Sequence, residues 1–527
     1  MNAANIPAGR MAPCRGRASL VVLVMLVAMG LCVAAPARAA SCESVASLSL
    51  PDATITIAQT VPAGAFTMPA SYNPPALMGS IPVSFSDLPA FCRVAATLKP
   101  TADSDIKIEV WLPVSGWNGK LQSVGNGGWA GIISYPALSD ALRQGYATAS
   151  TDTGHAGANG SFALGHPEKV VDFAYRSEHE MTLKAKAIIA AFYGKAPRYS
   201  YWNGCSTGGK QGLTEAQRFP SDYDGIIAGA PANYMIHLHA WSLWVAQAVH
   251  KTPESYIPPA KYPLIHKAVL DACDTLDGVK DGLLENPRLC RFDPKTIECK
   301  TGDGPDCLSA AQVEATRQIY SPAVNPRTKQ EIFPGVERGS EMFWGVLAGP
   351  QPAGIAAETF QYVIFKDPQW DYRKLNFDSD ITFADKVDGG LNNAINPNLI
   401  PFFSRGGKLL MYHGWNDALI TPGNSVNYFH SVVKVMGGPA KTAGSLRLFM
   451  VPGMDHCRGG DGPNDFDVMG AIVPWVEQGK APEQMIASHS TKGKVDRTRP
   501  LCPYPRVAKY KGTGSTDEAA NFACARP

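Results

Sequence analysis

The stretch that decides the fold is Arg-Tyr-Ser-Tyr-Trp-Asn-Gly at residues 198–204, followed by Cys-Ser-Thr-Gly at residues 205–208. The first part is typical of a β-strand, and residues 208–218 are predicted to be helical. The junction matches G-x-S-x-G, in which a tight strand-to-helix turn lifts a serine hydroxyl above a sheet. The turn also directs a backbone N–H and the helix N-terminus toward a developing oxyanion. Ser206 is therefore the candidate nucleophile and Thr207 a candidate oxyanion donor; the alternative is an ordinary Gly-Ser turn.

Strands and helices alternate on both sides of this junction. Residues 41–100 are expected to form an N-terminal cap of short strands and turns. The predicted strands are residues 106–113, 119–125, 145–151, 198–204, 223–230, 408–413 and 446–452, and the predicted helices are residues 175–194, 208–218, 424–435 and 466–478. This alternation predicts an α/β fold with a mostly parallel sheet.

The alternation breaks between residues 231 and 406, a stretch with four cysteines and many Pro and Gly turns. The 527-residue chain is therefore expected to hold one catalytic domain, residues 40–230 and 407–527, interrupted by an inserted lid domain, residues 231–406. Aromatic side chains of the lid either stack on an aromatic substrate or form the core of the lid itself, and the second interpretation is favoured for any one of them. They include Phe343, Trp344, Trp370 and Tyr372.

Residues 1–39 have the order of a secretory signal peptide, with three arginines, the apolar run 18–35 and a small-residue cleavage site at 37–39. A transmembrane anchor is the alternative, since the run is just long enough to span a bilayer. Removal of the signal takes four arginines and no acid, which changes the net charge from +2 to −2. We expect a secreted or periplasmic protein without a membrane or nucleic-acid partner, because neither a second spanning run nor a basic excess remains.

A serine nucleophile needs a general base and a group that orients it. In sheets that carry this serine turn, the order along the chain is Ser, then Asp or Glu, then His. Asp417 follows the predicted strand 408–413, and His456 follows the predicted strand 446–452. Both therefore lie at the carboxyl ends of strands, where α/β sheets build their sites.

Other histidines are weaker candidates. His413 ends a strand and is expected to be structural. His155 can line the site, but a loop histidine satisfied by local hydrogen bonds is favoured. His179-Glu180 lacks the second histidine of H-E-x-x-H, so the sequence does not support a zinc protease.

Two cysteines adjoin the candidate catalytic residues, because Cys205 precedes Ser206 and Cys457 follows His456. A disulfide holds two Cα atoms about 5.5 Å apart. A bond between these cysteines would therefore bring the serine and the histidine together, whereas the alternative is two unrelated buried thiols. Loss of two of the 12 cysteines with the signal leaves an even set, which predicts disulfides in an exported chain.

Together these residues resemble the tannase and feruloyl esterase family of secreted α/β hydrolases. The resemblance rests on Cys205-Ser206, Asp417 and His456-Cys457, and it extends to residues 125–129, 201–209, 225–231, 414–417 and 453–457. It implies an α/β-hydrolase fold with a mostly parallel sheet and a large inserted lid. It also implies that Ser206 is the nucleophile, His456 the base and then the acid, and Asp417 the orienting group.

The resemblance further implies two oxyanion donors and five disulfides. The donors are the N–H of Thr207 and that of either Gly127 or Gly128. The implied pairs are Cys42–Cys92, Cys205–Cys457, Cys273–Cys290, Cys299–Cys307 and Cys502–Cys524. The spacing of the cysteines alone would permit many other pairings.

Carboxylates gather in a turn-forming segment of the lid at residues 271–283. Oxygen ligands on a flexible loop suit Ca²⁺, although the spacing is not that of an EF-hand and a solvated acidic turn is the alternative. The resemblance implies a structural calcium ion held by the side chains of Asp274, Asp277 and Asp281 and by the carbonyls of Val279 and Leu283.

The leading hypothesis is a serine carboxylic ester hydrolase that cleaves esters of aromatic acids, such as feruloyl, other hydroxycinnamoyl or galloyl esters, through an acyl-enzyme. The substrates expected are small aromatic esters or esters of plant polyphenols and polysaccharides. Terephthalate-type half-esters and a general acyl esterase are the alternatives among enzymes. A catalytically inactive binding module is the alternative outside them.

Overall fold

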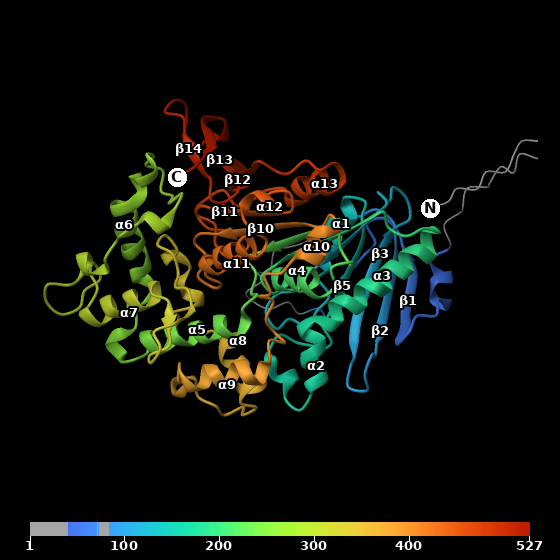
Figure 1. Ribbon diagram of the computed structural model, residues 1–527, viewed down its shortest axis with the longest axis horizontal. Helices are drawn as coiled ribbons and strands as arrows, with labels where there is room; N and C mark the ends of the chain where they lie inside the picture. The colour runs from blue at the N-terminus through green and yellow to red at the C-terminus, as the bar shows by residue number, and fades with distance from the viewer. Residues whose placement is uncertain (1–40, 71, 73–83) are drawn as a thin grey trace, which may run out of the picture. The chain divides into compact units, whose positions relative to one another are not determined.

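A nine-stranded sheet runs through the described part of the chain (Figure 1). The computed structural model describes residues 41–70, 72 and 84–527, and the predicted signal peptide lies outside them. These described residues cluster as one unit. In sheet order the strands are β1 (Ala53–Val61), β2 (Phe91–Leu98), β3 (Ile106–Pro113), β5 (Ala147–Thr151), β4 (Lys120–Val124), β6 (Tyr199–Cys205), β7 (Gly225–Gly229), β10 (Lys408–Gly414) and β11 (Leu446–Val451).

The six strands from β5 to β11 in this order pair in parallel. β1, β2 and β3 pair antiparallel, and β3 is also antiparallel to β5. The predicted α/β fold with a mostly parallel sheet is therefore confirmed. The carboxyl ends of β6, β7, β10 and β11 meet at one edge, where α/β folds place their sites.

The N-terminal region differs from the expected cap. β2 pairs with β3 over eight residues, from Phe91 opposite Pro113 to Leu98 opposite Ile106, and β1 pairs with β2 in turn. Both strands therefore extend the main sheet. The alternation of apolar and polar residues predicted strands here, but it does not say which open edge a strand joins.

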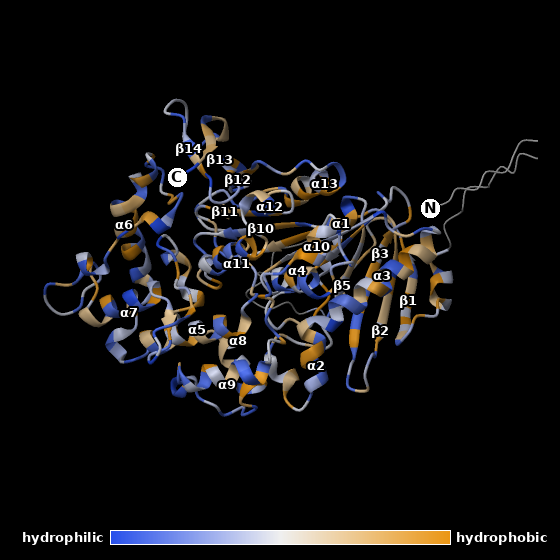
Figure 2. Cartoon of the chain, viewed as in Figure 1, coloured by the Kyte–Doolittle hydropathy of each residue, from blue (hydrophilic) through white to orange (hydrophobic). Residues whose placement is uncertain are grey.

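Helices cover both faces of the sheet. α3 (Ser177–Tyr193), α4 (Thr207–Arg218) and α11 (Pro422–Val435) pack on one face, and α1 (Tyr135–Arg143) and α13 (Val468–Gln478) pack on the other. Neighbouring residues of one strand serve the two faces: Ile226 joins the core under α4, whereas Ile227 joins the core with Trp475 of α13. Figure 2 shows the central strands largely in hydrophobic colours, while the helices show both hydrophobic and hydrophilic colours.

The lid segment, residues 231–406, has its own hydrophobic core, and Figure 1 shows its helices α5 to α9 gathered beside the sheet. Trp344 is fully buried in this core, and Trp370 stacks on Phe360 and Phe365. Trp344 and Trp370 therefore pack within the lid core, which is the interpretation that the sequence favoured. The elements are α5 (Met235–Val249), α6 (Tyr262–Cys273), α7 (Ala310–Tyr320), β8 (Ala323–Val324), β9 (Glu331–Phe333), α8 (Gly354–Glu358), α9 (Ser379–Asp388) and α10 (Ile400–Ser404).

The lid core does not stop at the predicted domain boundaries. Trp129 and Phe173 join it from before the segment, and Ala418 and Ile420 join it from after. The boundaries at 231 and 406 therefore stay a prediction. Among α-helices and strands, the remaining elements are α2 (Pro167–Val171), α12 (Pro439–Thr442) and two C-terminal strand pairs, β12 (Met485–Thr491) with β13 (Lys494–Leu501) and β14 (Val507–Tyr510) with β15 (Phe522–Ala525).

Five disulfides connect the cysteines of the described chain. They are the implied pairs Cys42–Cys92, Cys205–Cys457, Cys273–Cys290, Cys299–Cys307 and Cys502–Cys524. Disulfides are typical of oxidising compartments. Within the described ranges no helix is long and apolar enough to cross a membrane.

Replacement of Ile227 by alanine tests the packing of the central strand. Its side chain is fully buried in β7, so Ile227→Ala should lower the free energy of unfolding by about 2–5 kcal/mol. Urea denaturation followed by tryptophan fluorescence measures the loss. Ile486→Ala in β12 is the control, because that side chain is 50% exposed, and it should change stability little. Equal effects of the two variants would contradict the packing described.

Candidate active site

The strand-to-helix turn at Ser206 forms as the sequence predicts. Ser206 has φ 66° and ψ −125°, a backbone conformation rare for a residue with a side chain. A Cβ on Gly204 would lie 2.4 Å from the carbonyl oxygen of Gly208, so only glycine fits there. The N–H of Ser206 donates to the carbonyl of Gly229 at 3.0 Å, which anchors the turn to the end of β7. The serine is thus raised at the carboxyl edge of the sheet.

The predicted oxyanion donors lie at the start of α4, where the glycine turn packs against Thr207. Thr207 is the first residue of this helix, so its N–H has no partner in a preceding helical turn. The Thr207 hydroxyl donates to the carbonyl of Gly128 at 3.1 Å, and the Gly208 N–H donates to the carbonyl of Asn126 at 2.8 Å. These contacts bring the glycine turn to Thr207. The second donor, the N–H of either Gly127 or Gly128, stays a prediction.

Asn126 and Gln211 hold this turn in place, and sequence analysis did not single them out. The Asn126 N–H donates to the Gln211 side-chain oxygen at 3.0 Å, and the Asn126 amide donates to the carbonyls of Ile132 and Thr151, each at 2.9 Å. Asn126 lies inside the Gly-Asn-Gly-Gly-Trp segment that carries the resemblance. That segment was the available signal, but its partner Gln211 is distant in sequence.

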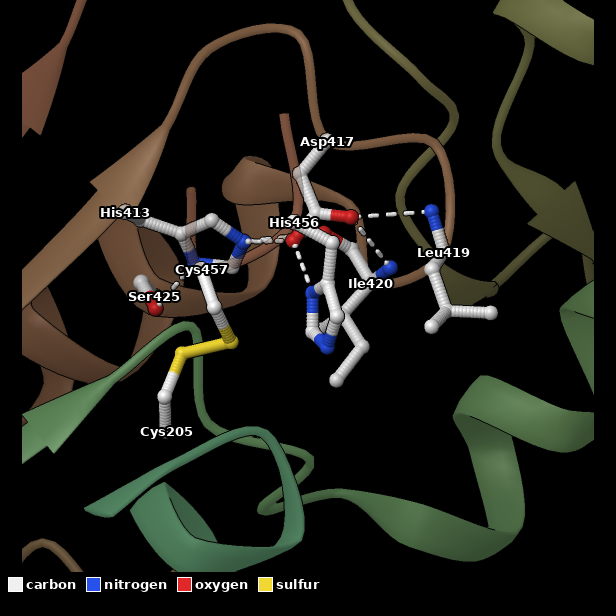
Figure 3. The surroundings of a disulfide bond; sticks show 8 residues. All are labelled: Cys205, His413, Asp417, Leu419, Ile420, Ser425, His456 and Cys457. Atoms are coloured by element: carbon white, nitrogen blue, oxygen red, sulfur yellow. Dashed lines mark hydrogen bonds and ion pairs between the residues drawn. A yellow bond between two sulfur atoms is a disulfide. The ribbon is translucent and has the colours of Figure 1, made fainter. Parts of the chain in front are cut away.

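Asp417 and His456 meet at the ends of two adjacent strands. β10 and β11 pair in parallel, so the loops that follow them lie side by side. His456 Nδ1 lies 2.6 Å from Asp417 Oδ2 (Figure 3). Asp417 Oδ1 accepts the N–H groups of Leu419 and Ile420 at 2.8 and 2.9 Å. The carboxylate is therefore fixed from its own loop while it orients the histidine.

His413 contacts the same carboxylate from the other side. Its Nε2 lies 2.9 Å from the carbonyl of Ile420 and 3.1 Å from Asp417 Oδ2, and its Nδ1 lies 2.7 Å from the Ser425 hydroxyl. A nitrogen facing a carbonyl must carry the proton, so Nε2–H donates. His413 is fully buried, which agrees with the structural role expected for it. Its support of Asp417 is a contact that sequence analysis missed.

These contacts set the charge of Asp417. Burial by itself raises the pKa of a carboxyl group, but the charge of His456 and the hydrogen bonds from His413 and His456 outweigh it. The pKa of Asp417 therefore lies below its ordinary value. The group stays ionised at neutral pH, as an orienting carboxylate requires.

The disulfide Cys205–Cys457 joins the serine turn to the histidine loop. The two Cα atoms are 6.0 Å apart although the cysteines are separated by 252 residues in sequence. Figure 3 shows the bridge beside His456 and Asp417. Since Ser206 adjoins one cysteine and His456 the other, the bond constrains both candidate catalytic residues.

His155 has the structural contacts that the sequence favoured. Its Nε2 lies 2.7 Å from the carbonyl of Trp129, and its ring stacks on Phe162 at 3.8 Å. Burial lowers the pKa of His155, so it stays neutral. It therefore supports the turn around Trp129.

Asp455, directly before His456, is a further group that sequence analysis missed. Burial and the charges of Asp461 and Asp417 raise its pKa to about 7. Asp455 therefore titrates in the neutral range, next in sequence to His456.

The predicted calcium ligands lie in one loop, but among the described residues the ligand atoms of Asp274, Asp277 and Asp281 do not all come within 4.8 Å of one another. The Asp274 carboxylate accepts the N–H groups of Asp281 and Gly282, at 3.2 and 3.1 Å to Oδ1. Asp277 accepts the N–H of Val279 at 2.9 Å, and Asp281 accepts that of Leu283 at 3.2 Å. The loop is thus folded around its own carboxylates.

The charges of this loop fit a bound cation. Asp281 pairs with Arg499, and both side chains are 2% exposed. Burial and repulsion from Asp281 and Asp274 raise the pKa of Asp277, and burial raises that of the neighbouring Glu285 to about 8. One arginine therefore faces several buried carboxylates, which is the donor set that a hard divalent cation takes.

A parallel sheet with a serine at a strand-to-helix turn, followed along the chain by an aspartate and a histidine at later strand ends, defines an α/β hydrolase. The chain matches the family described as "Tannase and feruloyl esterase" over residues 92–525. It is similar to an uncharacterized esterase of Xanthomonas campestris pv. campestris, with 38% identity over 96% of this chain and 94% of the relative. A probable feruloyl esterase B of Aspergillus clavatus is 35% identical over 90% of this chain and 93% of the relative.

Solved structures agree with these sequence relatives. Feruloyl esterase B from Aspergillus oryzae superposes with a TM-score of 0.87 and 32% identity, over 92% of this chain and 99% of that chain. Tannin acyl hydrolase from Aspergillus niger has the same fold, with a TM-score of 0.74 and 22% identity over 92% and 95% of the two chains. The chain belongs to the tannase and feruloyl esterase family, and it is a carboxylic ester hydrolase.

Removal of the Cys205–Cys457 bond tests its role. The double variant Cys205→Ala, Cys457→Ala should lose about 2–5 kcal/mol of unfolding free energy, because the bond closes a long loop. Its kcat should fall about 10–100-fold, since the serine and the histidine are no longer tied together.

The matched control is Cys299→Ala, Cys307→Ala, which removes a lid disulfide that spans only eight residues. Its kcat should stay near wild type. Full activity of the Cys205, Cys457 double variant would contradict a role of the bond in positioning Ser206 and His456.

Proposed function

We propose that this protein is an exported serine esterase that cleaves esters of aromatic acids through an acyl-enzyme intermediate. The observation that carries the proposal is the His456–Asp417 pair, 2.6 Å apart, tied by the Cys205–Cys457 bond to the strained serine turn. Export is supported by the predicted signal and by the five disulfides. The aromatic acyl group is supported by relatives named as feruloyl esterases.

Each residue has a defined task in this mechanism. Because Nδ1 of His456 faces Asp417, its Nε2 is the nitrogen that takes the proton from the Ser206 hydroxyl. The serine oxygen attacks the ester carbonyl, and His456 then gives the proton to the departing alcohol. A water molecule repeats the sequence on the acyl-enzyme and releases the acid. The ionised Asp417 stabilises the imidazolium that forms in each half.

The oxyanion is stabilised by backbone groups. The Thr207 N–H at the start of α4 points where the negative charge develops, and the N–H of Gly127 or Gly128 is the second donor. Gln211 and Asn126 keep that turn in position, so these donors need no rearrangement during the reaction.

The acyl group of the substrate is an aromatic acid in this proposal. Ferulate and related hydroxycinnamates are the first choice, and gallate and terephthalate half-esters are the alternatives. A panel of kcat/KM values over methyl ferulate, methyl caffeate, methyl p-coumarate, methyl gallate and mono(2-hydroxyethyl) terephthalate ranks them. Much faster hydrolysis of long aliphatic esters would favour a general acyl esterase.

Replacement of the proposed nucleophile and orienting group tests the mechanism. Ser206→Ala should abolish the acyl-enzyme, and Asp417→Asn should lower kcat about 10⁴-fold because the histidine then takes the wrong tautomer. Hydrolysis of methyl ferulate and burst kinetics with a chromogenic ester measure both effects.

The exposed Ser47→Ala serves as the control and should keep wild-type kcat. Activity that survives Ser206→Ala in a correctly folded variant would disprove the serine mechanism. An inactive wild-type protein that binds aromatic esters would identify a binding module.

We also propose a structural calcium ion in the lid loop. Asp274, Asp277 and Asp281 would hold it by their side chains, and Val279 and Leu283 by their carbonyls. The loop contacts the C-terminal hairpins: Asp281 pairs with Arg499 of β13, and Glu285 accepts the Ala508 N–H of β14. The ion would neutralise the buried carboxylates and so tie the lid to these hairpins. It takes no part in the chemical step.

Chelation tests this site. At a calcium concentration of 100 Kd the ion would add about 2.7 kcal/mol of stability, so EGTA should lower the Tm and added Ca²⁺ should restore it. Asp277→Asn should lose the response. Asp271→Asn is the matched control, because this exposed carboxylate pairs only with Lys267 on the same helix. A Tm that ignores both chelator and calcium contradicts the proposal.

A further inference from the structure

A group of side chains of metal-ligating types lies outside the proposed catalytic site and the proposed calcium loop. His179 at the start of α3, Glu215 near the end of α4 and Asp222 in the turn before β7 each place one ligand atom within 4.8 Å of the others. His179 Nδ1 lies 2.6 Å from Asp222 Oδ2, and its ring stacks on Phe219 at 3.8 Å. The histidine ring is therefore fixed with Nδ1–H donating to the Asp222 carboxylate, and a metal ion bound at Nδ1 would displace that proton.

Glu215 is the unusual member of this group. Its side chain is 1% exposed, and neither carboxylate oxygen has a hydrogen-bond partner in the described structure. Asp222 faces it, but two ionised carboxylates only accept hydrogen bonds. Lys186 lies nearby, yet its ammonium donates to the backbone carbonyl of Asp222. A buried carboxylate without a partner is costly, so the arrangement lacks a cation or a proton.

The donor set selects the kind of cation. Imidazole suits zinc and neighbouring transition metals, whereas calcium takes oxygen ligands alone. Zinc binds nitrogen and carboxylate oxygen at about 2.0–2.2 Å, which spaces ligand atoms about 3.4 Å apart in a tetrahedron. The three ligand atoms lie within 4.8 Å of one another, and the 2.6 Å contact between His179 Nδ1 and Asp222 Oδ2 must widen to reach this spacing. His179 is 24% exposed, so one side of the group is open to solvent for a water ligand.

We propose that His179, Glu215 and Asp222 form a binding site for a divalent transition metal, with Zn²⁺ the preferred ion. The site joins three elements that meet on one face of the sheet: α3, α4 and the turn that enters β7. Glu215 is nine residues after Ser206, so the ion lies about 13 Å along α4 from the nucleophile. Its role is to clamp the far end of the helix whose N-terminus carries the oxyanion donor.

Zinc titration of the full mature protein tests the site. The protein is stripped with EDTA, returned to saturating Ca²⁺ and titrated with Zn²⁺ in a calorimeter, with Co²⁺ absorption as a spectroscopic probe of ligation. The wild type should take up one equivalent and gain thermal stability. His179→Gln and Glu215→Gln should each weaken binding more than about 100-fold, since even partners that only orient a ligand cost about 10–100-fold.

Two controls separate this site from other metal sites. Glu180→Gln removes the adjacent carboxylate, which pairs with Lys184 at 2.6 Å, and should keep zinc binding. Asp277→Asn alters the proposed calcium loop and should also keep it. Glu215→Gln preserves the shape of the buried side chain, so a folded variant is expected.

Some outcomes overturn the proposal. If the wild type binds no more zinc than Glu215→Gln and His179→Gln, Glu215 is a protonated acid that donates to Asp222. If Asp277→Asn removes the zinc equivalent and His179→Gln does not, the ion belongs to the lid loop. Neither result bears on the proposed esterase mechanism, because the Ser206 and Asp417 variants test that mechanism independently.

Discussion

The structure depends on the steric constraint at the junction of β6 and α4. The serine has a positive φ, Gly204 leaves no side chain between the strand and the helix, and Gly208 leaves none between the helix and the turn at residues 125–126. The helix then begins directly at the serine, and the glycine turn at residues 126–128 packs against that beginning. The proposed nucleophile, a helix N-terminus and the glycine turn therefore meet at one point.

The parallel sheet brings the other proposed catalytic groups to the same edge. β6, β7, β10 and β11 are consecutive neighbours, so the loops at their carboxyl ends share one edge. Asp417 and His456 follow two of these strands and are joined through Asp417 Oδ2. The Cys205–Cys457 bond then fixes the loop after β11 to the serine turn, which limits how far the proposed base His456 can move.

Much of this arrangement could be predicted from local patterns. The serine turn, Asp417 and His456 lie at ends of strands that the apolar runs already marked, and the cysteines beside them suggested the bond. The pairing of β1 and β2 with the main sheet could not be predicted, because an alternating pattern does not name its partner strand. The contact of His413 with Asp417 was equally hidden, since a buried histidine at a strand end has many possible partners.

The sequence by itself determined the strand-to-helix turn, the order of Ser, Asp and His, and the presence of acidic residues in the lid loop. These are local features, and they follow from backbone sterics and from residue chemistry. Only the tertiary structure decided that His179, Glu215 and Asp222 meet, and that the lid core extends beyond residues 231–406. Such contacts join residues far apart in the chain, so packing of whole elements sets them.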